Sequence, residues 1–184
     1  TEIYTLSLHD ALPIWLFAGE LDEILARYLP AKAKTQLAGL TKRLEKLEKD
    51  HLAERIARSS PAGPAPVLGA RVLETEAAVG GVIAANLARV DARGWQRLRE
   101  HLLRRYEAGF LPRAAAEEIE AALPAAARRQ TLTAAYSAGS FLKSAETRLP
   151  AASPKRAALA RYRERTARLQ NFSLGAPEYL LLSS

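Results

Sequence analysis

Apolar residues recur at intervals of three and four positions through most of this chain, which is the spacing of residues on one face of an α-helix. In the stretch 31–58, the leucines at this spacing are Leu37, Leu40, Leu44 and Leu47. Two heptads of leucines are fewer than the three or four that predict a coiled coil, so packing within a bundle is favoured. Further helices are predicted over residues 16–29, 68–90, 91–108, 113–123, 124–149 and 154–171.

Proline, glycine and capping residues predict where these helices begin and end. Pro30 ends the first helix, because its ring and its missing N–H disrupt a helix interior. Asp91 is a predicted N-cap, and Gly109 suits the left-handed position that follows a helix. Ser153-Pro154 predicts the start of the last helix, with a capping serine before a proline in the first turn.

Glycines also fall inside predicted helices. The Gly80-Gly81 pair lowers helix stability and is expected to mark a kink or a close crossing of two helices. Gly139 lies in the middle of the helix predicted over 124–149. A helix-turn-helix motif with Gly139 in its turn is a weaker alternative, because Ser140 follows where an apolar residue is usual.

No stretch alternates apolar and polar residues with period two, so strands are not predicted. The predicted fold class is therefore all-α, a bundle of about six or seven amphipathic helices behind a disordered or poorly packed N-terminal leader. Three prolines in the segment 59–66 predict a loop between two groups of helices. The expected organisation is a leader at 1–15, N-terminal helices at 16–58, a loop at 59–66, a helical bundle at 67–175 and a C-terminal tail at 176–184.

The leader resembles something other than a protein segment. Residues 1–14, TEIYTLSLHDALPI, resemble the translation of one reading frame of a common short-read sequencing-library adapter. The likeness covers all of these positions in order, and it implies that native sequence begins only near Leu16. His9 and Asp10 are therefore not candidate site residues, and the leader is set aside in predicting the fold. The likeness also implies that the chain is a fragment whose upstream residues are missing.

The chain is basic, with 27 lysine and arginine residues against 20 acidic ones and a formal charge of +7. Without Glu2 and Asp10 of the leader, 27 basic residues face 18 acidic ones, so the remainder carries +9. The lack of cysteine removes disulfides, thiolate metal sites and cysteine nucleophiles, and it agrees with a cytoplasmic location. The most apolar stretch, 67–90, carries charged residues such as Arg71 and Glu74, so no membrane span is expected.

The sequence contains no recognisable catalytic or metal-binding motif. His51 and His101, the two histidines outside the leader, belong to no metal pair of the H-E-x-x-H kind, and a solvent-facing or structural role is predicted for both. Neighbouring acids such as Glu117 and Glu118 do not share a helix face. No P-loop and no nucleophile elbow occur. No cofactor, metal ligand or catalytic residue is therefore predicted, and the enzymatic interpretation is weak.

Arginines carry the strongest indication of function. On the last helix, four residues form a stripe about 80° wide at 100° per residue, and these are Leu159, Tyr162, Thr166 and Leu169. Arginines flank the stripe on both sides, so the helix is expected to pack by the stripe and to present guanidinium groups to phosphate or carboxylate. The candidate polyanion-binding residues are Arg156 and Arg163 on one side, Arg161, Arg165 and Arg168 on the other, and Arg104 and Arg105 on an earlier helix.

Three functions are compatible with these features. The leading hypothesis is a non-enzymatic interaction protein, a helical bundle that binds a protein partner or associates with itself. Abundant alanine and arginine with little lysine is associated with GC-rich genomes and indicates a bacterial source. The alternatives are a basic nucleic-acid-associated protein, and the helical terminal part of a larger enzyme whose catalytic domain lies upstream. Nucleic-acid binding would weaken steeply with salt, because the release of counterions from phosphates drives it.

Overall fold

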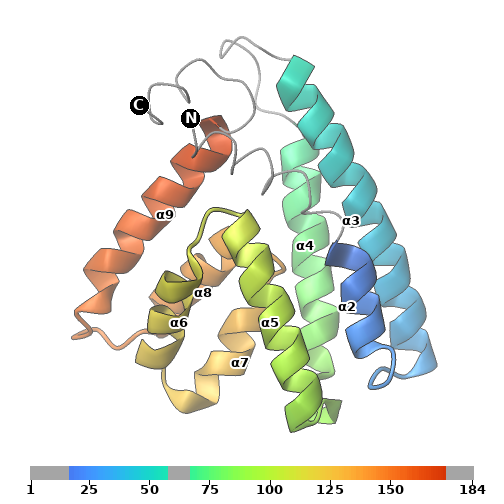
Figure 1. The fold of residues 1–184 in the computed structure, drawn as a ribbon, viewed down its shortest axis with the longest axis horizontal. Helices are drawn as coiled ribbons and strands as arrows, with labels where there is room; N and C mark the ends of the chain where they lie inside the picture. Colours follow the sequence, from blue (N-terminus) through green and yellow to red (C-terminus); the bar gives the residue numbers. More distant parts are fainter. Residues whose placement is uncertain (1–16, 58–66, 173–184) are drawn as a thin grey trace.

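The computed structural model describes residues 17–57 and 67–172, and these residues fold into helices joined by short turns (Figure 1). The all-α fold class is thereby confirmed for this part of the chain. The predicted leader at 1–15, loop at 59–66 and tail at 176–184 lie outside the described residues. In chain order the elements are α2 (Phe17–Leu25), α3 (Ala31–Ala57), α4 (Val67–Ala85), the short 3-10 helix η2 (Leu87–Arg89), α5 (Ala92–Ala108), α6 (Arg113–Ala122), α7 (Ala125–Thr133), α8 (Ala138–Arg148) and α9 (Lys155–Phe172).

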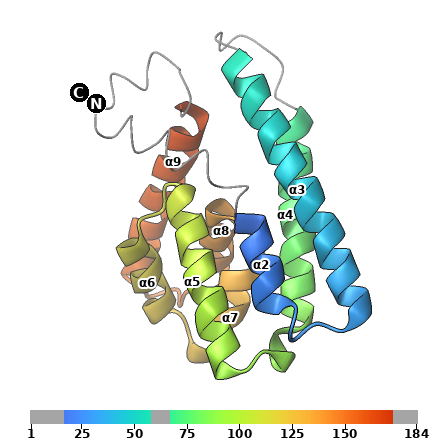
Figure 2. The ribbon, with the colours of Figure 1, turned by 45° about the vertical axis from the view of Figure 1, so that its right-hand side comes forward.

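The two longest helices, α3 and α4, form an antiparallel pair at one side of the molecule, and α9 stands at the other side (Figure 1 and Figure 2). Helix α5 lies between them and contacts α2, α6, α7 and α8, while α9 packs against α8 and α6. The helices before and after the predicted loop share one apolar core. None of the described helices is both long enough and apolar enough to cross a membrane.

Helix α5 buries the apolar face that its sequence predicts. Leu98, Leu102 and Tyr106 on this face are fully buried. Asp91 is the N-cap, as predicted, and its side chain accepts a hydrogen bond from the Gly94 amide over 2.8 Å. The cap satisfies one of the amides that the first turn of a helix leaves without a partner. Helix α5 is therefore fixed both by its cap and by its burial.

The turn after α5 differs from the prediction at Gly109. Gly109 has a φ of −87°, and Phe110 instead takes the left-handed conformation with a φ of 71°. The Leu111 amide donates to the Tyr106 carbonyl over 2.9 Å, which is the bond that closes a Schellman turn. Glycine at 109 relieves crowding, because a Cβ there would lie 3.2 Å from the Cβ of Ala138.

The prediction of one helix over 124–149 is wrong, because residues 134–137 separate α7 from α8. This interruption carries the side chain of Tyr136 into the core. Ser137 then caps α8 and accepts a hydrogen bond from the amide three residues later over 3.3 Å. Gly139 consequently lies in the first turn of α8, not between two helices as the helix-turn-helix alternative required.

The segment between α7 and α8 crosses α4 closely at Gly80. A Cβ added to Gly80 would lie 2.7 Å from the Cα of Ala135. The Tyr136 amide also donates to the Glu76 carbonyl of α4 over 3.3 Å. Of the two outcomes expected for the glycine pair, the close crossing is therefore present at Gly80, whereas a Cβ at Gly81 would meet open space.

Gly80→Ala and Gly81→Ala should change the free energy of unfolding in opposite directions. At Gly80 the added methyl group meets the backbone of residues 133–135, so we expect a loss of about 1–3 kcal/mol. At Gly81 it meets nothing, and alanine is favoured over glycine in a helix by about 0.5–1 kcal/mol. Urea denaturation of the two variants measures the difference. Equal effects would show that the crossing at Gly80 is not tightly packed.

Candidate functional site

Arg105 lies at the centre of a buried polar network that joins α5 to three other parts of the fold. Its side chain is 3% exposed. Nη2 donates to Glu48 Oε1 on α3 over 2.6 Å and to Glu76 Oε1 on α4 over 3.0 Å. Nε donates to the Tyr136 carbonyl, between α7 and α8, over 2.6 Å. Arg105 therefore belongs to the core, which corrects its prediction as a residue of a polyanion-binding surface.

His101 and Tyr136 extend this network toward α2. The Arg105 guanidinium lies 4.0 Å from the Tyr136 ring centroid, within the range of a cation–π contact. The His101 ring is nearly parallel to that of Tyr136, and its Nε2 forms a hydrogen bond with the Tyr136 hydroxyl. Nδ1 lies 3.3 Å from Glu20 Oε2, and Glu20 also pairs with Arg104. His101 is fully buried, so the structural one of its two predicted roles applies.

Burial sets the protonation states of this network. The pKa of Glu76 rises to about 7, because burial disfavours its charge and the carboxylate of Glu48 repels it, although Arg105 opposes the shift. The pKa of His101 falls to about 4, because burial disfavours the imidazolium, although Glu20 opposes this shift. At neutral pH the imidazole is therefore uncharged, and Glu76 is near its titration midpoint.

The chain of contacts from Glu20 through His101 to Tyr136 has the connectivity of an activated hydroxyl, in which a carboxylate orients an imidazole toward a nucleophile. Tyr136 is only 1% exposed, however, so its hydroxyl is closed to a substrate. Burial also raises the pKa of Tyr136 above its usual value, which keeps the phenol protonated. Among the side chains that the structure describes, no three His, Asp or Glu residues gather to hold a metal ion, and His51 is half-buried on α3. The burial of Tyr136 and His101 therefore indicates a structural role for the network.

Helix α9 uses its two arginine-bearing sides differently. On one side, Arg156 donates to two backbone carbonyls near the end of α8 over 3.1 and 3.2 Å, and Arg163 pairs with the Glu146 carboxylate. Both residues thus attach α9 to α8. On the other side, Arg161 and Arg165 are exposed and form no hydrogen bond or ion pair with any residue that the structure describes.

The remaining predicted arginines have separate locations. Arg104 is 41% exposed and pairs with Glu20, so it supports the contact between α5 and α2. Arg168 belongs to α9, but its side chain lies outside the described residues. The structure therefore does not bring the predicted arginines together, and the outer side of α9 is where their charge is available.

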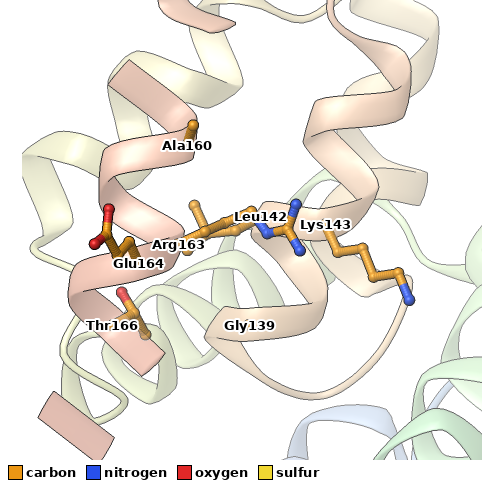
Figure 3. A pocket seen from close by; sticks show the side chains of 7 residues that line it. All are labelled: Gly139, Leu142, Lys143, Ala160, Arg163, Glu164 and Thr166. Atoms are coloured by element: carbon orange, nitrogen blue, oxygen red, sulfur yellow. The ribbon is translucent and has the colours of Figure 1, made fainter. Parts of the chain in front are cut away.

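A pocket of about 470 Å³ lies between α8 and α9 (Figure 3). Its walls include Gly139, Leu142 and Lys143 of α8 together with Arg163, Glu164 and Thr166 of α9. Of the stripe that the sequence predicts for α9, Leu159 and Thr166 are buried, and the side chain of Leu169 lies outside the described residues. The pocket depends instead on where α8 begins and on how the two helices are placed. Neither follows from residue spacing within one helix.

A second group of cations, which sequence analysis missed, surrounds the contact between Tyr28 and Asp91. The Tyr28 hydroxyl donates to Asp91 Oδ1 over 2.9 Å, which joins the turn after α2 to the start of α5. Hydrogen bonds from the Gly94 amide and from Tyr28 lower the pKa of Asp91, and the charges of Arg27 and Arg93 add to this effect. Tyr28 and Asp91 are 63 positions apart, so no spacing rule relates them.

Comparisons of the chain with protein-family models, with curated proteins and with solved structures found no match. Any proposal of function therefore rests on the geometry of the described residues.

Arg105→Met should destabilise the fold strongly. It leaves Glu48 and Glu76 in the core without their cation, and breaking a buried ion pair in this way costs about 3–5 kcal/mol. A triple variant that adds Glu48→Leu and Glu76→Leu removes the unpaired charges and should recover most of the loss. Urea denaturation measures both. If the triple variant is as unstable as the single one, charge pairing is not what Arg105 contributes.

Glu76→Gln should change how stability depends on pH. Folding raises the pKa of Glu76 from 4.5 to about 7. The protonated carboxyl therefore contributes fully to the free energy of unfolding below pH 4.5, and this contribution is lost as the pH rises through 7. Glutamine does not titrate, so the free energy of unfolding of the variant should rise relative to that of the wild type between pH 4.5 and about 7, by roughly 1–3 kcal/mol. His101 titrates in both proteins and cancels from the difference. Denaturation at several pH values tests this, and a pH-independent difference would contradict it.

Proposed function

We propose that this chain is a non-enzymatic helical interaction domain that binds an acidic segment of a partner protein through the outer side of α9. The observation that supports this proposal is the exposure of Arg161 and Arg165, which lie one helical turn apart and pair with no residue in the described ranges. Figure 1 shows α9 at the edge of the molecule, where a partner can approach it.

The basic side chains of α9 differ in whether a carboxylate or carbonyl group of the fold already contacts them. Arg156 caps carbonyls of α8, and Lys155 pairs with Glu118 on α6 over 3.3 Å. A ligand for these residues would have to break a contact of the fold. Arg161 and Arg165 are solvated instead, so a carboxylate that binds them displaces only water. Arginine forms bidentate bonds with carboxylates, which favours aspartate and glutamate side chains as its ligands.

A nucleic acid is the second candidate, because the same guanidinium groups can contact phosphates. Glu164 is exposed on α9 three residues after Arg161, and it adds a negative charge beside the outer side. A continuous phosphate backbone is repelled by this carboxylate, whereas a short acidic segment can place its side chains around it. The protein partner is therefore the proposal that the described charges favour.

Fluorescence anisotropy of a labelled glutamate-rich peptide tests the proposal. Arg161→Ala combined with Arg165→Ala should weaken binding by roughly fivefold or more, as expected when two exposed charge pairs are lost. Arg43→Ala combined with Lys46→Ala removes the same charge from exposed positions on α3 and should leave the affinity nearly unchanged.

Equal weakening by both double variants would show that net charge, and not the outer side of α9, attracts the peptide. Tighter binding of single-stranded DNA than of the peptide, with a steep dependence on salt, would support the nucleic-acid candidate instead.

A further inference from the structure

The N-terminal end of α8 presents an open backbone position to the pocket between α8 and α9. Ser137 caps the helix by accepting the Ser140 amide, while the Gly139 amide donates to no atom in the described part of the chain. A Cβ at Gly139 would meet nothing within 4 Å, so a ligand has room to approach this amide. The first amides of a helix carry partial positive charge and attract anions.

Thr166 of α9 faces the same pocket with an unused hydroxyl. The residue is 3% exposed and lines the pocket, yet its hydroxyl forms no hydrogen bond with any other described residue. Other helical threonines behave differently, because Thr75, Thr131 and Thr133 each donate to the carbonyl four residues earlier. The Thr166 hydroxyl is therefore available to a ligand that enters the pocket.

Lys143 and Arg163 supply positive charge from both helices. Lys143 follows Gly139 by four residues and therefore lies on the same side of α8. It is exposed and forms no ion pair with the residues that the structure describes. Arg163 reaches from α9 toward Leu142 of α8 (Figure 3). It also pairs with Glu146 of α8.

One carboxylate, that of Glu164, also lines the pocket. Glu164 and Thr166 are two residues apart on α9, so they lie on nearly opposite sides of the helix. The charge of Glu164 repels an anion from its own edge of the pocket. It therefore directs the anion toward Gly139, at the N-terminal end of α8, and toward Lys143 one turn later.

The size of the pocket indicates a ligand larger than a single ion. Its volume of about 470 Å³ falls in the range of roughly 300–1,000 Å³ that is typical of small-molecule sites. Ala160 adds exposed apolar surface to its walls, and the fully buried Leu142 lies beneath them. We propose that this pocket binds a small phosphate ester, whose phosphate accepts hydrogen bonds from the Gly139 amide, the Thr166 hydroxyl and Lys143. The body of the ester rests on the apolar walls. This site is separate from the outer side of α9.

Two-dimensional ¹H–¹⁵N NMR of the whole chain, titrated with phenyl phosphate, tests the proposal. The Gly139 amide signal should shift saturably, because this amide donates to the ligand. Lys143→Gln and Thr166→Val should each weaken binding by about tenfold, as expected for the loss of a hydrogen bond to a charged group. Arg161→Gln, on the outer side of α9, should leave the affinity unchanged.

Two further titrations separate the phosphate from the body of the ester. Phenyl phosphate should bind more tightly than inorganic phosphate, and phenol alone should cause no saturable shift. Equal affinities for phenyl phosphate and inorganic phosphate would overturn the ester as the ligand. A Gly139 signal that does not move, or binding that is unaffected in Lys143→Gln and Thr166→Val, would overturn the site itself.

Discussion

The positive charge of Arg105 determines how the helices of this bundle can pack, because two carboxylates are buried around it. Leucine stripes are only weakly selective, and helices that carry them can pack in several registers with similar burial. A buried polar network is more demanding, since any other arrangement leaves a charge or a hydrogen-bonding group without its partner. Glu48 and Glu76 both bind the same guanidinium. The register of α3, α4 and α5 is therefore set by charge as much as by apolar contact.

The break between α7 and α8 belongs to the same arrangement. In a continuous helix the amide and carbonyl of Tyr136 would form hydrogen bonds within that helix. In the interruption, the carbonyl instead accepts a hydrogen bond from Arg105 and the amide donates to the Glu76 carbonyl. Gly80 makes room for this segment against α4. The interruption in turn creates the N-terminal end of α8, and with it one end of the pocket beside α9. A structural requirement of the core thus shapes a surface that is available for binding.

Periodicity and capping rules predict most of the helices, because they depend on contacts between residues close in sequence. The buried face of α5 and the cap at Asp91 follow from such local patterns, and so does the separation of the α9 arginines into two sides. The rest depends on partners far along the chain. Arg104 and Arg105 are adjacent and identical in type, yet only the placement of α3 and α4 makes the second a core residue. The alanine-rich stretch 124–149 favours one helix locally, and the contact with α4 overrides this preference.

The sequence separation between Arg105 and its partners also bears on when the network forms during folding. Its partners Glu48, Glu76 and Tyr136 lie 57, 29 and 31 positions away. Individual helices form from local contacts, whereas contacts over such separations require the closure of long loops. The guanidinium and its carboxylates stay hydrated until the helices that carry them have come together. We therefore expect the network to form after its helices have docked, to act mainly on the unfolding rate and to prolong the lifetime of the native state.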